Sequence, residues 1–340
     1  MIVLGIESTC DETACAIVKD GREILANVVA SQAEMHEVYG GVVPELACRR
    51  HVDLVVPVIE QAITKAKINL EDVDLIAVAH APGLVGALLI GLNAAKSLAI
   101  TLKKPFIGVN HIEAHLYAAM MSHDEAAISY PCIGAVLSGG HTSLVLIRDI
   151  GDYELLSQTV DDAIGEAFDK VAKMMGLPYP GGPQIERLAA EGDPSRHPFR
   201  PGHVKRNPLN FSFSGLKTAV LYAIRGQNIQ NSEITPTLEE MRDIAASFQR
   251  TALLDILEKT GKTAEMYGCR QVIFGGGVTN NQALRRLFSE NSSHLECLWP
   301  TMGLSLDNAA MIAGLGYHKY RLKGCGDPLD LEPQTRLSCW

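Results

Sequence analysis

The sequence predicts an α/β protein made of two copies of one plan, with a cleft between the copies. Each copy begins with two short apolar runs joined by a polar, small-residue turn, at residues 3–18 and again at 133–147. Each then continues with a further apolar run, a glycine-containing turn and a helical stretch. Apolar runs bounded by Gly, Ser and Asp are typical of β-hairpins. Two hairpins, each followed by a strand–turn–helix unit, therefore indicate a duplication.

The elements of the first copy follow from these runs. Residues 3–6 and 14–18 predict the hairpin strands, and residues 7–13 the turn between them. Residues 75–79 predict the next strand, which the turn His80–Gly83 separates from a helix over 84–100.

The second copy repeats that order. Residues 133–137 and 143–147 predict strands around a turn at 138–142. Residues 271–274 predict a strand, followed by three glycines and a helix from about Asn281. We expect two domains, an N-terminal lobe over 1–128 and a C-terminal lobe over 129–340, the latter with a helical and basic insert near 161–225.

Several helices and loops are expected in and after that insert. Asp161 and Asp162 offer an N-cap for a helix that ends at Met175. Residues 178–183, rich in Pro and Gly, predict a rigid turn, and residues 195–210 a loop. Further helices are expected over 214–225, 237–267 and 306–322.

Composition excludes some classes of protein. Of 340 residues, 47% are hydrophobic and 20% charged, which excludes wholesale disorder. The net charge of −9 argues against nonspecific coating of nucleic acid, although a local basic patch is compatible with it. Aromatic residues, at 6%, are too few for a stacking-rich single-strand binder.

We also expect a cytoplasmic protein without a membrane segment. The N-terminal residues include Glu7, Asp11 and Glu12 and no cationic start, unlike a signal peptide. The longest apolar run, residues 84–92, is far shorter than the ~20 residues of a spanning helix. The eight cysteines form no CxxC pair, which favours reduced thiols over disulfides.

The sharpest local motif is the HIEAH sequence at residues 111–115. His111 and His115 share one helical face, so both imidazoles can reach one metal ion, although an isolated pair at this spacing more often consists of ordinary polar helix residues. At about 100° per residue, Glu113 points away from such a metal. This geometry argues against a metalloprotease, whose base follows the first histidine directly. Asp307 either complements a helix dipole or completes a His₂Asp set suited to Zn or Fe.

Two glycine turns are candidate phosphate sites. Gly139 and Gly140, between Ser138 and His141, let the backbone approach a ligand, and consecutive N–H groups can form an anion nest. Residues 275–277 precede a helix in the same way, and Asn281 could bond a base or ribose. Neither is a Walker A sequence, and either could be only a turn.

Two charged features remain. Asp169 is an acid on a predicted helix, where pairing with Lys173 is the simpler interpretation. The insert carries four cations, two histidines and no acid over residues 196–206, and is equally well a solvated loop or a patch for RNA phosphates. Its cations are Arg196, Arg200, Lys205 and Arg206.

Together these motifs resemble the bacterial tRNA N6-adenosine threonylcarbamoyltransferase family, once described as an O-sialoglycoprotein endopeptidase, over essentially the whole chain. The matching segments are GIESTCDET at 5–13, GVVPELA at 41–47, HIEAH at 111–115, LSGGHT at 137–142, GEAFDK at 165–170, YPGGP at 179–183, FSFSGLKT at 211–218 and GGGV at 275–278.

The resemblance implies an actin-like ATPase fold, two lobes around a nucleotide cleft, in agreement with the duplication. It implies transfer of the threonylcarbamoyl group from threonylcarbamoyl-adenylate to N6 of adenosine 37 in tRNAs that read codons beginning with A, with release of AMP. It also implies one divalent metal, Fe or Zn, per subunit. Expected partners are tRNA, a shorter actin-like paralogue and a small P-loop ATPase.

The resemblance also assigns residues. His111, His115 and Asp307 would hold the metal. The adenylate would be held by Leu137, Ser138, Gly139, Gly140, His141, Asp169, Gly182 and Asn281. Glu186 departs from the family, since many members have Asp four residues after this glycine, although the longer acid can still reach a ribose hydroxyl.

The chemistry expected from these parts is direct transfer. N6 of adenine is a poor nucleophile, and a Lewis-acid metal would orient and polarise the carbamoyl group. No Ser–His or Cys–His nucleophile pair is evident, which argues against a covalent enzyme intermediate. Glu12 is a candidate for removing the N6 proton. The competing interpretations are a kinase or ATPase of the same fold, a metalloprotease and a noncatalytic scaffold.

Overall fold

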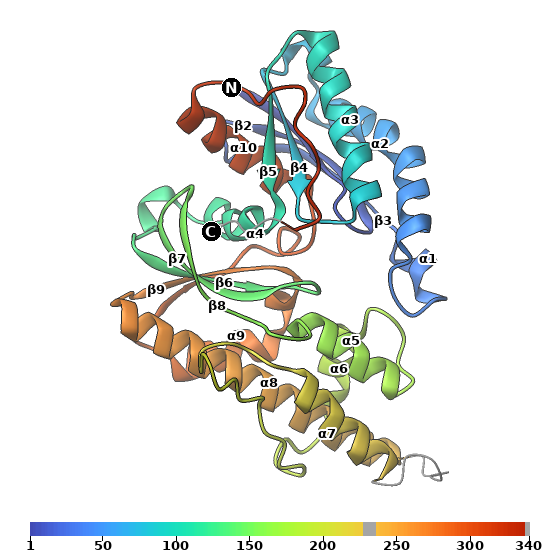
Figure 1. Ribbon diagram of the computed structural model, residues 1–340, viewed down its shortest axis with the longest axis vertical. Coiled ribbons are helices and arrows are strands. Elements are labelled where there is room, and N and C mark those ends of the chain that lie inside the picture. Colours follow the sequence, from blue (N-terminus) through green and yellow to red (C-terminus); the bar gives the residue numbers. More distant parts are fainter. Residues whose placement is uncertain (227–235, 337–340) are drawn as a thin grey trace. The chain divides into compact units, whose positions relative to one another are not determined.

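Two five-stranded sheets with the same strand order confirm the predicted duplication. The computed structural model describes residues 1–226 and 236–336 (Figure 1). The first sheet has the order β3-β2-β1-β4-β5, and the second the matching order β8-β7-β6-β9-β10. In each, a three-stranded antiparallel meander is extended by two parallel strands.

Each sheet belongs to one compact unit. Unit 1 comprises Met1–Ile128 and Pro300–Trp340, and unit 2 comprises Ser129–Trp299. The expected boundary near residue 128 coincides with this division. The expected C-terminal lobe over 129–340 is longer than unit 2, which ends at Trp299. The chain returns to unit 1 because its last helix, at Ala309–Lys323, packs against β1, β2 and β4. Nothing local in the sequence signals this return of the chain.

The sheet of unit 1 is covered on both faces. Its strands are β1 (Ile2–Glu7), β2 (Glu12–Lys19), β3 (Glu23–Ser31), β4 (Leu75–Ala81) and β5 (Phe106–Asn110). The paired helices α2 (Pro44–Ala66) and α3 (Val85–Leu102) lie on one face. Helices α4 (His111–Met121) and α10 (Ala309–Lys323) pack together on the other (Figure 1). The short helix α1 spans Ala33–Glu37.

Helix α3 differs from the expected short apolar run. Over 18 residues its mean hydropathy is 1.6, so by length and composition it is the one helix of the described residues able to cross a membrane. The apolar run seen in the sequence ends at Leu92 because Asn93 follows it, but the helix continues through further apolar residues to Leu102. Ala87, Leu88, Leu92 and Ala95 are buried, and the helix packs against β4 and α2.

The strands of unit 2 repeat this plan, and its helices are longer and more numerous. The strands are β6 (Cys132–Leu137), β7 (Thr142–Asp149), β8 (Asp152–Gln158), β9 (Gln271–Gly275) and β10 (Glu296–Leu298). The helices are α5 (Ile164–Met174), α6 (Gly181–Ala189), α7 (Ser214–Arg225), α8 (Leu238–Tyr267) and α9 (Gln282–Asn291). A buried core that includes Phe168, Phe248 and Phe274 joins these helices to the sheet.

Helix ends follow local hydrogen bonding. Thr237 and Glu240 form a capping box at the start of α8, and Gly268 ends that helix in the left-handed conformation. Helix α5 begins at Ile164 rather than at an Asp161–Asp162 cap, because Asp161 instead accepts the backbone N–H groups of Phe213 and Ser214. The proline-rich turn at 178–183 is shorter than expected, since α6 begins within it at Gly181.

Candidate metal centre and glycine turns

The carboxyl ends of three parallel strands place the first group of functional side chains. Strands β1, β4 and β5 are parallel neighbours, so Glu7 at the end of β1 and Asn110 at the end of β5 lie at the same sheet edge. The Asn110 side chain accepts the N–H groups of Ile112 and Glu113 and caps α4. His111 is therefore the first residue of that helix.

Asp307 reaches the same place from the other end of unit 1. It lies in the segment before α10, not in the helix as the predicted span of 306–322 had it. Asn308 caps α10 by accepting the N–H of Met311, and its amide donates to the carbonyls of Leu304 and Leu306. These bonds fix the short segment that presents the Asp307 carboxylate.

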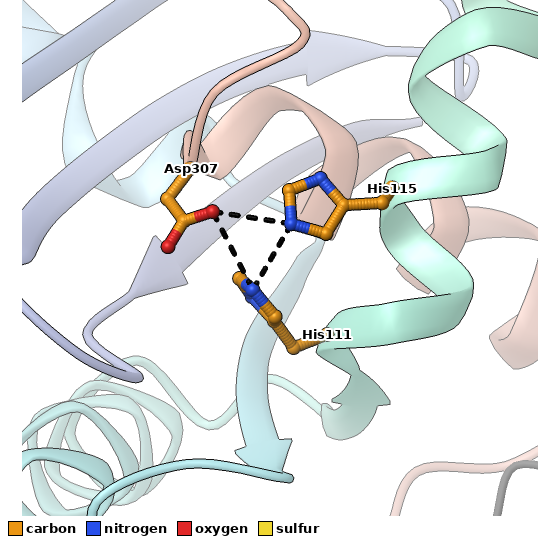
Figure 2. Close-up of side chains that lie close together, drawn as sticks. All are labelled: His111, His115 and Asp307. Atoms are coloured by element: carbon orange, nitrogen blue, oxygen red, sulfur yellow. Dashed lines mark hydrogen bonds and ion pairs between the residues drawn. The ribbon is translucent and has the colours of Figure 1, made fainter. Parts of the chain in front are cut away.

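The three expected ligands converge (Figure 2). Nε2 of His115 lies 3.1 Å from Nε2 of His111 and 3.1 Å from Oδ1 of Asp307. Nε2 of His111 lies 3.5 Å from the same carboxylate oxygen. With metal–ligand bonds of ~2.1 Å, ligand atoms in tetrahedral or octahedral sites stand about 3.0–3.4 Å apart. The donor set and its spacing thus fit one divalent ion of the Zn or Fe type.

Glu7 is the site residue that sequence reasoning missed. Its side chain is fully buried, and Oε2 lies 2.9 Å from Nδ1 of His111 while Oε1 accepts the N–H of Thr9. A carboxylate behind a ligating histidine holds the ring and leaves Nε2 free for a metal. The signal was present in the sequence only as an acid at the end of a buried strand.

Charge and burial set the ionisation of these groups. Burial disfavours the charged form of His111, but the neighbouring carboxylates of Glu7 and Asp307 raise its pKa well above the ordinary value. Burial likewise opposes ionisation of Asp307, yet His111 and His115 lower its pKa well below the usual range. The shifts of His111 and Asp307 both favour the charged form, because each of these two groups faces an opposite charge.

Glu12 and Glu113 have different surroundings. Glu12 begins β2, is half-buried, and accepts a hydrogen bond of 3.1 Å from the Ser31 hydroxyl. Burial, then the charges of Asp307 and Asp11, raise the pKa of Glu12 to about 9. Glu113 pairs with Lys319 of α10 at 3.1 Å. As its angle on the helix predicts, it is not one of the converging ligands.

The glycine turn of the second copy has an open backbone. It joins β6 to β7, where Ser138 N–H donates to the carbonyl of His141 and the Ser138 hydroxyl accepts the N–H of His141. Leu137 and Ser138 are buried, whereas Gly139, Gly140 and His141 are exposed. A Cβ at Gly139 or Gly140 would meet nothing within 4 Å, so a ligand can approach this backbone closely.

The other expected adenylate residues lie on α5, on α6 and just before α9 of unit 2. Asp169 accepts the N–H of Gly181 at 2.7 Å, rather than pairing only with a neighbour on its helix, and the space beside Gly182 is open. Glu186 accepts the N–H of Gln282 at 2.6 Å. Asn281 caps α9 and donates to Gln249. The Glu186 and Asn281 side chains therefore already form hydrogen bonds within the protein. The backbone has open space beside it at Gly139, Gly140 and Gly182.

Comparison with known proteins identifies the family. The tRNA N6-adenosine threonylcarbamoyltransferase profile matches residues 23–314. A protein of that name from Protochlamydia amoebophila is 63% identical over 99% of this chain and 98% of its own. Another from Chlamydia felis is 50% identical over 93% and 91%. The chain belongs to this family.

Solved structures add the fold of this threonylcarbamoyltransferase family member. HypF from T. kodakarensis matches with a TM-score of 0.61 at 15% identity, over 95% of this chain and 48% of its own. Component A of the Acidaminococcus fermentans (R)-2-hydroxyglutaryl-CoA dehydratase matches with a TM-score of 0.52 at 15% identity, over 94% and 99%. These matches confirm the expected duplicated actin-like fold. That the protein is a transferase follows from its family membership.

The basic loop of this family member is open to solvent. Its cations Arg196, Arg200, Lys205 and Arg206 are all exposed. Within residues 1–226 and 236–336, none of their side chains makes a hydrogen bond or ion pair. Main-chain bonds shape the loop, among them Phe199 N–H to the carbonyl of His197. Arg196 lies near enough to Asp193 and Glu240 for its charge to contribute to lowering the pKa of both carboxyl groups.

Proposed function

We propose that the protein transfers the threonylcarbamoyl group from threonylcarbamoyl-adenylate to N6 of adenosine 37 in tRNAs that read codons beginning with A. AMP is released. Family membership supports the class of reaction, since the relatives are named for threonylcarbamoyl transfer to tRNA adenosine. The observation that carries the mechanism is the convergence of His111, His115 and Asp307 at spacings suited to a metal.

His111, His115 and Asp307 would hold one Zn or Fe ion per subunit. When bound, such an ion supplies a Lewis acid that orients and polarises the carbamoyl oxygen. Three protein ligands leave open positions for substrate. Glu7 would leave Nε2 of His111 available to the ion, because its carboxylate bonds the other ring nitrogen.

The adenylate would be held by unit 2. Backbone N–H groups at Gly139, Gly140 and Gly182 would hydrogen-bond the phosphate, where the departing AMP gains negative charge. Asp169, Asn281, Leu137, Ser138 and His141 would shape the remaining contacts. Glu186 would reach a ribose hydroxyl only with the oxygen that does not bond Gln282.

The reaction balances without a covalent enzyme intermediate. N6 of adenosine bonds the carbamoyl carbon, the bond from that carbon to the phosphate oxygen breaks, and AMP leaves with the electron pair. N6 loses one proton, which Glu12 would accept in its ionised form. Because the pKa of Glu12 is raised to about 9, this role predicts a transfer rate that increases as the pH rises toward that value. Normal turnover in Glu12→Gln would remove this role from Glu12, and trapping of an acylated enzyme would contradict direct transfer.

Transfer RNA would reach the site with help from the basic loop. Phosphates are bound by unpaired Lys and Arg side chains through counterion release, which makes binding sensitive to salt. Arg196, Arg200, Lys205 and Arg206 supply such cations. The proposal includes two protein partners, a shorter actin-like paralogue and a small P-loop ATPase. It places the reaction in the cytoplasm.

The direct test combines purified protein, Zn²⁺ or Fe²⁺, threonylcarbamoyl-adenylate and unmodified tRNA, with the two partner subunits added in a second series. Nucleosides of the digested tRNA are then analysed by mass spectrometry. The proposal expects threonylcarbamoyladenosine at position 37 and one AMP per transfer. ATP hydrolysis without any modified nucleoside in either series would instead support an ATPase of the same fold.

A further inference from the structure

Helix α4 carries two candidate metal ligands and, between them in sequence, the buried carboxylate of an ion pair. Glu113 lies between the two histidines in sequence, and its side chain is only 5% exposed. Oε2 accepts a hydrogen bond from Nζ of Lys319 on α10 at 3.1 Å, across 206 residues of sequence. Oε1 has no hydrogen-bond partner among the described residues. Lys319 is therefore the counter-charge of a carboxylate held away from water.

The same two segments meet at two further places. The Tyr117 hydroxyl lies 2.7 Å from Nε2 of His318. The Ser122 hydroxyl, at the end of α4, accepts the N–H of Thr301 at 2.9 Å. Helix α4 is thus bonded along its length to the segment over 301–323, which also carries Asp307.

Close backbone packing accompanies these bonds. A Cβ at Gly314 of α10 would come within 2.6 Å of the Tyr117 ring and 2.7 Å of the carbonyl of Gly21. The two helices therefore approach each other at a position where only glycine fits. A change in the contact between α4 and α10 would move the histidines relative to Asp307.

His115 depends most on the placement of this helix. His111 is oriented by Glu7, but Nδ1 of His115 is buried without a hydrogen-bond partner among the described residues. The ring instead makes contacts through its Nε2 and packs edge-to-face on the His111 ring, with 4.6 Å between the ring centroids. Its position is determined by the backbone of α4.

We propose that the Glu113–Lys319 ion pair is a positioning element that sets the distance from His111 and His115 to Asp307. The proposal rests on the proposed metal site and assigns a role to the acid of the HIEAH sequence. Glu113 holds no metal and moves no proton in this role. It keeps α4 in register with α10, so that the three ligand atoms stay within 4.8 Å of one another.

The test measures metal binding by the full chain, independently of catalysis. Zn²⁺ affinity is measured by chelator competition, and the geometry of the site by the visible absorption of bound Co²⁺. For Lys319→Met we expect the Kd for Zn²⁺ to rise by about 10-fold or more, as for other outer-shell changes, with an altered Co²⁺ spectrum. Lys319→Arg keeps the charge and should bind Zn²⁺ within about threefold of wild type.

Two controls separate positioning from stability. The double variant Glu113→Gln/Lys319→Met leaves no unpaired buried charge, so it should recover thermal stability while its Zn²⁺ affinity stays weak. If Lys319→Met does not fold, the double variant decides the question. Lys259→Met breaks an ion pair in unit 2, Lys259–Asp255 at 2.8 Å, whose carboxylate is as buried as that of Glu113 and whose lysine is more buried than Lys319. It should lower stability without changing Zn²⁺ affinity.

The outcomes are distinct. Normal Zn²⁺ affinity and a normal Co²⁺ spectrum in both the single and the double variant would overturn this inference alone. Failure of the wild-type chain to bind Zn²⁺ or Co²⁺ would contradict the metal site, and with it both this inference and the proposed function.

Discussion

Replacing Glu7 by Gln removes a charge while keeping the shape of the side chain. In the structure, one carboxylate oxygen lies 2.9 Å from Nδ1 of His111 and the other accepts the N–H of Thr9 at 2.6 Å. Glutamine offers one acceptor and one donor in place of two acceptors. When Nε2 of His111 binds a metal, Nδ1 carries the proton, so either orientation of the amide brings two donors together.

The cost of that conflict can be given a magnitude. A buried donor left without an acceptor costs about 1–3 kcal/mol. The variant can relieve this conflict if the His111 ring turns or moves away. The metal then binds more weakly, and its Kd rises by about 10- to 100-fold. Glu7→Gln should therefore bind Zn²⁺ about 10- to 100-fold more weakly than wild type.

The assay is chelator competition with Zn²⁺ on the full chain, with circular dichroism to confirm the fold. Glu12→Gln is the matched control, because it removes a carboxylate from the same hairpin that does not bond His111. We expect its Kd for Zn²⁺ to change by less than about threefold, as an indirect charge effect. Equal losses in both variants would refute the argument from hydrogen bonding, and no loss in Glu7→Gln would refute the orienting role of Glu7.

Three further predictions concern unit 2. Burial opposes ionisation of Asp162, but its ion pairs with Lys170 and Lys217 hold its pKa below the ordinary value. The charged Asp162 therefore stabilises the folded protein fully at pH values above the pKa that it has in the unfolded chain. This stabilisation is lost as the pH falls through the lower pKa of the folded protein. Denaturant unfolding should show Asp162→Asn destabilised by about 1–3 kcal/mol at pH 7, with the difference shrinking below about pH 4. Reversing the charges of Arg200, Lys205 and Arg206 should weaken tRNA binding. In filter-binding measurements, the slope of log Kobs against log salt concentration should become less steep by about 2–3. An unchanged slope would place tRNA recognition elsewhere. Gly182→Ala meets no atoms of the protein, so it should keep wild-type stability but weaken AMP binding in calorimetry; unchanged affinity would remove Gly182 from the adenylate site.

Local patterns in the sequence predicted the repeated elements well. The hairpin turns after β1 and β6, the strand–glycine–helix units and the spans of α7 and α8 depend on neighbouring residues, which the sequence shows directly. The local sequence pattern did not predict the third strand of each meander, β3 and β8. Residues 23–31 and 152–158 mix exposed and buried positions without a clear alternation, and their pairing with β2 and β7 decides their structure.

The candidate site was predictable only in part, because its parts meet over long distances in the chain. The spacing of His111 and His115 pointed to a shared helical face, but that spacing could not indicate Glu7, 104 residues away from His111. Asp307 was ambiguous as an isolated acid. The return of residues 300–336 to unit 1, which gives it its partners, depends on packing of α10 against β1 and β4.

The metal dependence of transfer tests the central claim most directly. Wild-type protein stripped of metal, the same protein restored with Zn²⁺ or Fe²⁺, and His115→Ala are each given threonylcarbamoyl-adenylate and unmodified tRNA with the partner subunits. We predict one metal per chain and modified tRNA only for the restored wild type. Modification at the wild-type rate by metal-free His115→Ala would contradict the account.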